Sequence, residues 1–430
     1  MPVFSILLSS GVLAGIIFLF WRNLGQDSTL KVFFWPALLL KLLCGILVGL
    51  MYAENFDTHI YQKMASRLTD FGFQNPAVYL RLVFLNDYSY TAIVSGIQYK
   101  TYSNSFFFAK LLSLLNFLTG RQYYLNSLFL SVFSFAGCWY FVVRLAYYFP
   151  NSQKAAVIAF LFFPSVVFWN SGVLKESILM GSLCFFWGSS LNLLYNSGKR
   201  NWFSGLLLLL SAYWLWKIKF FVAALVFCLT GTWLGFVWLE KKFVFFRQGF
   251  ARWLILPLLV GFLAIIMKQW HEEFELDIFF RRLVWNYKEL QSLSPGRPTI
   301  HFSGFEPNLY SVLSNIPEAL FSCLFRPFPW EGNNYFYFIA GLENLVIFIL
   351  FACAILGLFR GSNLKMNGFY LVLLIFCLVV AVTFAMATPN LGSLNRYRTT
   401  FLPFLIFLFL QTPFWQTFLN RFSFPFLKQR

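Results

Sequence analysis

Long apolar runs recur along the whole chain and are separated by short polar segments. Each run is close to the ~20 residues with which a helix crosses a bilayer. The runs lie near residues 3–21, 32–52, 122–143, 155–171, 177–195, 202–216, 218–238, 253–269, 336–358, 368–388 and 399–413. The pattern predicts an all-α polytopic membrane protein with about eleven transmembrane helices.

Two segments between runs are too long to be turns and too apolar to be free linkers. Residues 53–121 follow the second run, and residues 270–335 follow the eighth. Within them, 105–118 is apolar with one lysine, and 309–325 alternates apolar and polar residues at helical spacing. We therefore expect one transmembrane domain over 1–430 with two long outer loops, each carrying an interfacial helix.

Composition agrees with a lipid environment. The 430 residues are 59% hydrophobic and 11% charged, whereas a soluble domain is about 25% charged. The net charge of +17 could suggest nucleic acid as a partner. The basic residues are not concentrated in a polar domain that could follow a phosphate backbone, so we predict membrane lipids and no nucleic acid as partners.

Lysine and arginine in the short loops predict the orientation. With the N-terminus outside and the C-terminus in the cytoplasm, the inner loops hold fifteen cations and two acids, Asp27 and Glu240. The first run has no basic segment before it and no small-residue cleavage site, so we interpret it as a retained span. Compact loops and the lack of a retention signal favour a bacterial inner membrane, with both long loops in the periplasm.

A carboxylate follows the second run closely. Asp57 begins the segment DTHIY at the predicted membrane edge, where a carboxylate can act as a general base. The alternative is that Asp57 only caps the helix that continues through Tyr61.

Cations in short outer loops oppose the positive-inside trend. They are Lys175, next to Glu176, then Lys217 and Lys219, and finally Arg396 and Arg398 on either side of Tyr397. Such cations suit the oxygens of a phosphate or pyrophosphate. Alternatively, their side chains extend to lipid headgroups.

The segment 325–334 returns the second long loop to the membrane. It combines two prolines and a tryptophan with Arg326 and Glu331, which suggests a pocket wall that binds substrate. An aromatic anchor at the membrane interface is the alternative. The acidic run HEEFELD at 271–277 lacks metal-ligand spacing such as HExxH, so we predict no metal ligands and interpret it as a solvated helix face. A divalent-ion site is the alternative.

These stretches resemble the polytopic membrane glycosyltransferases of the GT-C fold, which take sugar from a polyprenyl-phosphate carrier. DTHIY with Ala65 is similar to their acidic motif, FPSVVFWNSGVLKES to the region of their second acidic residue, and NRYRTTFLPF to their Arg-Tyr motif. The resemblance implies hexosyl or pentosyl transfer to a glycan, lipid or protein. It makes Asp57 the base, Glu176 its support, and Arg396 or Arg398 the ligand of the carrier phosphate.

The chain also departs from that family's pattern. Asp57 lacks the paired DE or DxD form, so a divalent metal has no support and the lipid-linked sugar donor is the one expected ligand. Three other functions are alternatives, and one of them, a non-catalytic membrane scaffold, leaves the outward charge clusters unexplained. A polymerase or ligase of lipid-linked glycans, of the O-antigen or exopolysaccharide type, would rely on the arginines without an Asp base. A transporter or flippase of a lipid-linked intermediate would show repeats or broken helices.

Overall fold

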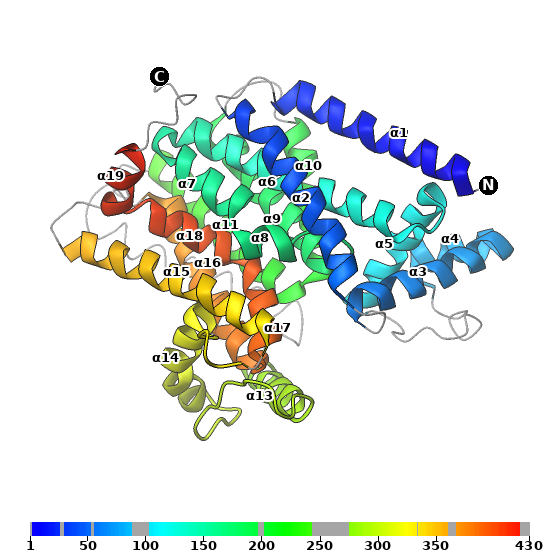
Figure 1. The fold of residues 1–430 in the computed structure, drawn as a ribbon. Helices are drawn as coiled ribbons and strands as arrows, with labels where there is room; N and C mark the ends of the chain where they lie inside the picture. The colour runs from blue at the N-terminus through cyan, green and yellow to red at the C-terminus, as the bar shows by residue number, and fades with distance from the viewer. Residues whose placement is uncertain are drawn as a thin grey trace. The chain divides into compact units, whose positions relative to one another are not determined.

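The computed structural model describes residues 2–25, 30–52, 56–87, 103–196, 202–242, 275–332, 334–359 and 367–421 (Figure 1). Every regular element named in these ranges is a helix. The chain divides into two compact units, Met1–Phe220 with Ser423–Arg430 (unit 1) and Phe221–Phe422 (unit 2). Each unit is described below by itself.

Seven helices in the described ranges are long and apolar enough to cross a membrane. They are Phe4–Gly25, Lys31–Met51, Tyr123–Tyr148, Lys175–Tyr195, Phe220–Leu239, Tyr335–Phe359 and Gly368–Ala387. Only 11% of the first and 28% of the sixth is buried against protein. Apolar surface of that extent is stable in lipid and costly in water. The protein is therefore an integral membrane protein, and seven of the predicted runs are confirmed as helices of spanning length.

Three of the other four predicted runs do not reach that standard, and the fourth cannot be compared with the structure. The run 155–171 is broken where Pro164, which has no backbone N–H, begins a new helix. The run 202–216 is a 17-residue helix. The run 399–413 contains the helix Leu402–Leu410, which forms a pair bent by 78° with the next helix, Pro413–Arg421. The run 253–269 and residues 271–274 of the acidic segment lie outside the described residues. The total of about eleven spans stays a prediction.

Unit 1 is built on long helices that pack through small residues. These helices are α1 (Pro2–Phe20), α2 (Lys31–Met51), α6 (Tyr123–Tyr148), α9 (Lys175–Tyr195) and α10 (Trp202–Ile218). Between α6 and α9, Gly137 and Gly181 meet so closely that a Cβ on Gly137 would lie 2.3 Å from the Gly181 carbonyl oxygen. Small residues allow such approach without the hydrophobic force that acts in water.

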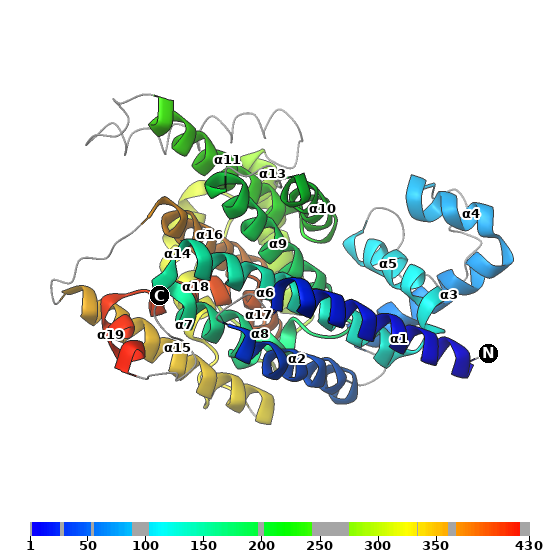
Figure 2. The same ribbon diagram turned by 90° about the horizontal axis from the view of Figure 1, so that it is seen from above.

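The first long loop folds into a helical layer of its own (Figure 2). It contains α3 (Asp57–Gln74), α4 (Pro76–Leu80) and α5 (Asn104–Thr119), so the helix expected at 105–118 is present. Its core consists of Met64, Leu68, Phe71, Tyr79, Leu82, Phe106 and Ala109. A buried amide network links Gln62 of α3 through Asn116 of α5 to Asn126 of α6. The layer is therefore attached firmly to the long helices of unit 1.

Shorter elements complete unit 1. They are η1 (Trp21–Gly25), η2 (Arg81–Leu85), η3 (Pro150–Ser152), α7 (Gln153–Val157), η4 (Ile158–Phe162) and α8 (Pro164–Trp169). The turn after α8 is held by backbone contacts: the Gly172 amide donates to Ser131 Oγ of α6 at 2.9 Å. Gly172 has φ +76°, a conformation that favours glycine, and a Cβ added there would lie 3.1 Å from the Gly45 carbonyl oxygen of α2.

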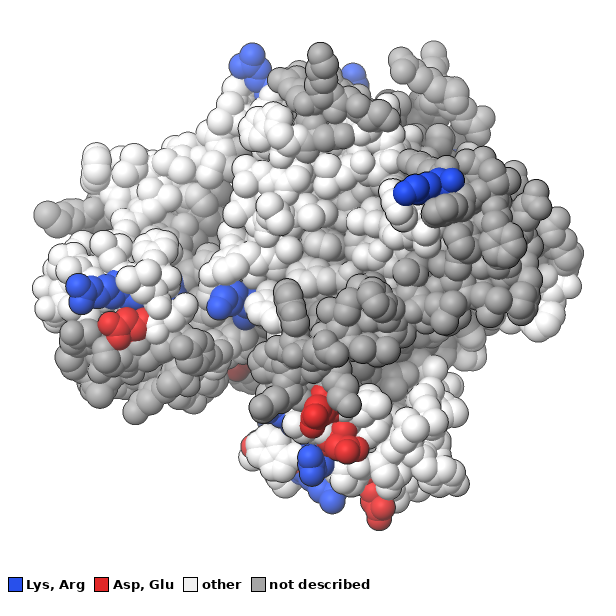
Figure 3. Space-filling view, turned by 180° about the vertical axis from the view of Figure 1, so that it is seen from behind, with Lys and Arg blue, Asp and Glu red and all other residues white. Residues whose placement is uncertain are grey.

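Unit 2 contains α11 (Phe220–Lys242), α13 (Leu276–Ser292), α14 (Leu309–Phe325), α15 (Tyr335–Phe359), α16 (Gly368–Ala387), α17 (Leu391–Tyr397), η7 (Arg398–Thr400), α18 (Leu402–Leu410) and α19 (Pro413–Arg421). The helix expected at 309–325 is α14, which packs on α15 and α16. On the face drawn in Figure 3, charged side chains of both signs gather on the projection formed by α13 and α14, and large areas elsewhere carry none.

Candidate functional site

At one end of unit 1, His59 connects three helices. Its Nε2 lies 3.3 Å from the Gly49 carbonyl oxygen near the end of α2. Its ring stacks on Tyr123 at the start of α6, with 4.6 Å between centroids. The start of α3 is thereby held at the ends of both long helices. The sequence suggested no role for His59, and the structure shows that it fixes the first turn of α3, two residues after Asp57.

Asp57 is the first residue of α3, and the N-cap position is occupied by Phe56, whose side chain makes no capping bond. Tyr61 lies one turn later on the same side of the helix, because residues four apart are neighbours. Phe56 contacts Tyr52, and Tyr52 contacts Trp169 of α8. The start of α3 therefore lies beside the segment that leads into α9.

Lys175 begins α9 and connects it to the loop helices. Its ammonium donates to Ser105 Oγ at 3.1 Å and to Asn104 Oδ1 at 3.3 Å. It also lies 5.4 Å from the centroid of the Tyr61 ring. Glu176 follows in the first turn of α9 and is 4% exposed. Through Tyr61, the structure brings Lys175 close to the helix turn that begins with Asp57.

The C-terminal end of α10 lies at the same end of unit 1 as Lys175. Asn104 Nδ2 donates to the Ile218 carbonyl oxygen at 3.1 Å, so Lys217 and Lys219, which flank Ile218, adjoin the start of α5. Both lysine side chains are partly buried. Sequence-predicted residues from three distant segments, at 57, 175–176 and 217–219, thus lie at one end of unit 1. We call this group of residues the lysine cluster; its members are Asp57, Tyr61, Asn104, Lys175, Glu176, Lys217 and Lys219.

Lys110 of α5 is a further member that sequence reasoning did not select. It is 3% exposed, and its ammonium donates to Asn86 Oδ1 at 2.8 Å and to the Leu82 carbonyl oxygen at 3.3 Å. These contacts place a cation at the C-terminal end of η2, where it is favoured by the helix dipole. Burial, together with the charge of Lys217, lowers the pKa of Lys110 to about 8. The feature of the sequence that could have identified Lys110 is its position as the lone lysine in the apolar run 105–118.

We expect Lys110→Met to stabilise the protein at pH 7. The folded pKa of about 8 lies below the unfolded value, so the unfolded state binds more protons between those two pH values. Stability from this group therefore rises from about pH 8 to about 10.5 and is at its lowest below pH 8. The penalty removed at pH 7 is about 3 kcal/mol. Thermal unfolding in detergent at pH 7 and pH 10 measures it; a gain as large at pH 10 as at pH 7 contradicts the assignment.

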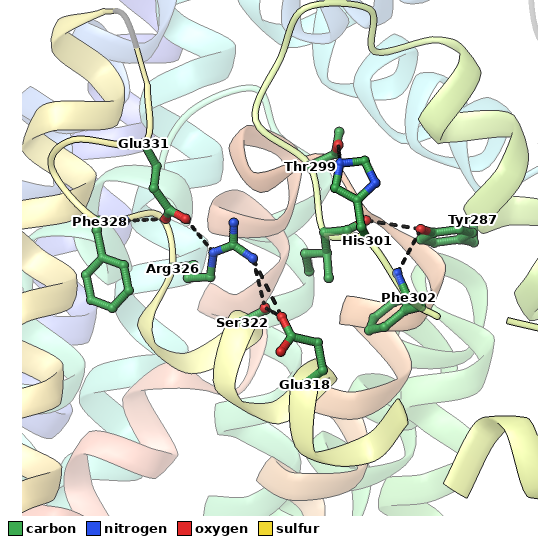
Figure 4. Close-up of polar contacts among 10 residues, drawn as sticks. Tyr287, Thr299, His301, Phe302, Glu318, Ser322, Arg326, Phe328 and Glu331 are labelled. Atoms are coloured by element: carbon green, nitrogen blue, oxygen red, sulfur yellow. Dashed lines mark hydrogen bonds and ion pairs between the residues drawn. The ribbon is translucent and has the colours of Figure 1, made fainter. Parts of the chain in front are cut away.

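In unit 2, Arg326 and Glu331 form a compact turn after α14 (Figure 4). Arg326 Nε donates to Glu331 Oε1 at 2.6 Å, and the Phe328 amide donates to Glu331 Oε2 at 2.6 Å. Arg326 Nη1 lies 3.6 Å from Glu318 Oε1 on α14. The carboxylates of Glu318 and Glu331 thus share the guanidinium of Arg326. The main role of Arg326 in this structure is therefore to stabilise the turn.

Glu331 also lines a cavity of about 460 Å³. The cavity lies between the turn that follows α13 and the start of α15, and Arg297, Asn334 and Tyr337 contribute to its walls. The sequence did not single out these three residues. Arg297 and Glu331 are 34 positions apart in sequence, so only the fold brings them together.

Arg396, Tyr397 and Arg398 end α17 and begin η7. The Arg396 guanidinium lies over the Tyr397 ring at 5.0 Å and is partly exposed. Arg398 is 1% exposed, with Glu343 and Cys323 as the charged or polar neighbours that act on it. Of the two arginines expected to bind a carrier phosphate, Arg396 is the one whose side chain remains accessible.

Within the described ranges, no three His, Cys, Asp or Glu side chains are grouped so that they could hold a metal ion. The seven cysteines are free thiols. Comparison of the chain with protein-family models, with curated proteins and with solved structures finds no match.

Proposed function

We propose that this protein is a membrane glycosyltransferase that moves a hexosyl or pentosyl group from a polyprenyl-phosphate carrier to an acceptor hydroxyl on a glycan, lipid or protein. The proposed place is the outer face of a bacterial inner membrane, with the N-terminus outside and the C-terminus in the cytoplasm. The observation that supports it is the lysine cluster, where Tyr61 joins the turn that begins with Asp57 to the ammonium of Lys175.

Glycosyl transfer needs a base for the acceptor hydroxyl and cations that stabilise the leaving phosphate. In the proposed step, the acceptor oxygen forms a bond to the anomeric carbon as the bond from that carbon to the phosphate oxygen breaks. The acceptor proton passes to the Asp57 carboxylate. The electron pair leaves with the carrier phosphate, whose charge Lys175, Lys217 and Lys219 stabilise. Ser105 and Asn104 hold the Lys175 ammonium, and Glu176, the next residue in the first turn of α9, has a supporting role in this proposal.

Apolar surroundings suit the carrier. The lysine cluster lies at the ends of α2, α9 and α10, and α2 and α10 expose apolar side chains such as Leu43 and Leu209, which suit lipid. A polyprenyl chain could therefore remain in lipid while its phosphate reaches the lysines. Holding donor and acceptor at one depth contributes to the rate by proximity.

A polymerase or ligase of lipid-linked glycans is the second candidate. The observation that favours it is the set of arginines in unit 2: Arg326 in the turn beside the cavity, the partly exposed Arg396, and the enclosed Arg398. Such an enzyme would bind pyrophosphate through arginine and would not depend on Asp57.

The test is sugar transfer by the purified protein in lipid vesicles supplied with polyprenyl-phosphate sugars. We expect Lys175→Gln and Lys217→Gln each to raise KM for the donor by about tenfold, since a hydrogen bond to a charged group contributes about 1.5–3 kcal/mol. Arg22→Gln is the matched control, because Arg22 is an exposed cation in η1. Unchanged KM in both lysine variants would place the donor elsewhere. Loss of transfer in Arg396→Ala with full activity in Asp57→Asn would favour the polymerase or ligase.

A further inference from the structure

The cavity in unit 2 has the size and walls of a small-molecule site. Its volume of about 460 Å³ falls in the range of roughly 300–1,000 Å³ that is usual for ligand pockets. Arg297, Glu331, Asn334 and Tyr337 supply polar groups to its walls. Arg297 and Asn334 are exposed, whereas Glu331 and Tyr337 are partly buried. A ligand can therefore enter from solvent and still meet fixed polar groups inside.

The two charged residues of the cavity wall, Glu331 and Arg297, differ in whether their charge is paired. Glu331 has one oxygen bound by Arg326 Nε and the other by the Phe328 amide, both at 2.6 Å (Figure 4). Arg297 makes no ion pair with any residue in the described part of the chain. The cavity thus presents one guanidinium whose charge is not neutralised. Guanidinium groups of this kind bind carboxylate or phosphate through two parallel hydrogen bonds.

The rest of the wall suits hydroxyl groups. The Asn334 amide both donates and accepts, the Tyr337 hydroxyl does the same, and a carboxylate with two bonds retains lone pairs for further donors. Tyr337 also brings an aromatic ring to this lining. An aromatic residue among several hydrogen-bonding groups matches a ligand with apolar ring faces and polar edges.

We infer that this cavity binds an acidic saccharide unit, meaning a sugar ring that carries a carboxylate or a phosphate. Arg297 binds the anionic group, and Asn334, Tyr337 and Glu331 bind the hydroxyls. The further statement that this sugar is the acceptor of the transfer reaction rests on the proposed function. Arg326 acts as a positioning residue, since it orients Glu331.

Binding to the full-length protein in detergent tests the inference directly. The probes are methyl glucuronide for the carboxylate, glucose 1-phosphate for the phosphate, methyl glucoside as the neutral sugar, and acetate and inorganic phosphate as anions without a ring. Saturation-transfer NMR and calorimetry measure affinity. We expect one of the two acidic sugars to bind about tenfold more tightly than the neutral sugar and than either anion alone.

Variants locate the site. We expect Arg297→Gln to weaken binding of that acidic sugar about tenfold, and Asn334→Ala to weaken it by a smaller factor. Arg281→Gln is the matched control, because Arg281 is an exposed arginine on α13 that does not line the cavity. Circular dichroism and thermal unfolding establish that each variant is folded.

Three results would overturn the inference: equal binding of methyl glucoside, binding of acetate or phosphate as tight as that of the acidic sugar, or wild-type affinity in Arg297→Gln.

The variant Asp57→Asn tests whether saccharide binding at the cavity is independent of the transfer reaction. That variant should bind the acidic sugar with wild-type affinity. Binding by a wild-type protein that transfers no sugar from any polyprenyl-phosphate donor would support the saccharide site and contradict the proposed function.

Discussion

Asp57→Asn is expected to lower kcat for sugar transfer by about 10²–10⁴-fold, the usual contribution of a general base. The substitution keeps the size of the side chain and removes its ability to accept a proton. His59 would still hold the start of α3 through its contacts with Gly49 and Tyr123, so the donor site should be retained. KM for the polyprenyl-phosphate sugar should therefore change little. Initial rates at varied donor concentration separate the two parameters.

Asp70→Asn is the control on the same helix. Asp70 is an exposed carboxylate of α3 that forms an ion pair with Arg121 at 2.5 Å. Exposed pairs contribute little to stability, about 0–1 kcal/mol, so this variant should transfer sugar at the wild-type rate. Full activity in Asp57→Asn would show that Asp57 is not the base. Equal loss in both variants would indicate that the charge of α3 matters and not the position of Asp57.

Gly137→Leu is expected to cause the largest loss of stability. A Cβ at this position would lie 2.3 Å from the Gly181 carbonyl oxygen and 2.6 Å from its α-carbon, and both are backbone atoms of α9. Backbone cannot move aside as a flexible side chain can, so α6 and α9 must separate. Overpacking usually costs about 1–3 kcal/mol and occasionally more; the loss here should exceed about 3 kcal/mol because backbone must move. Thermal unfolding in detergent measures the change.

Gly205→Ala is the matched control in α10. An added Cβ there meets nothing within 4 Å, and alanine favours a helix by about 1 kcal/mol relative to glycine. This variant should be as stable as the wild type or slightly more stable. If Gly137→Leu unfolds at the wild-type temperature, the close approach of α6 and α9 is incorrect. Because both helices end near the lysine cluster, we also expect reduced transfer in Gly137→Leu.

The two arginines near the end of α17 show why neighbouring residues of one type can differ in role. Arg396 lies over the Tyr397 ring and is partly exposed, which suits a ligand that arrives from outside. Arg398 is enclosed, and the carboxylate of Glu343 on α15 acts on it electrostatically. The three guanidinium nitrogens of Arg398 are buried without a hydrogen-bond partner among the described residues, and such burial is costly for a charged group. In NRYRTTFLPF the two arginines could not be told apart.

The sequence by itself determined the class of the protein. Uninterrupted apolar runs can be satisfied in lipid only by helices, and this is why seven spans and the helices at 105–118 and 309–325 were predicted close to their observed bounds. It also selected Asp57, Lys175 and Lys217 as polar groups near the ends of apolar runs. Run length alone could not show the break at Pro164 or the 78° bend before α19.

Only the tertiary structure decided which of those polar groups meet. The contact of Lys175 with Asn104 and Tyr61 joins residues more than 70 positions apart, and such pairing depends on helix packing and not on local pattern. The same holds for Lys110, whose burial follows from the fold of the first loop. It also holds for Arg297, which shares a cavity with Glu331 because α13 and the turn after α14 lie in one unit. Periodicity specifies which face of a helix is apolar, whereas the partner of each polar side chain is set by three-dimensional packing.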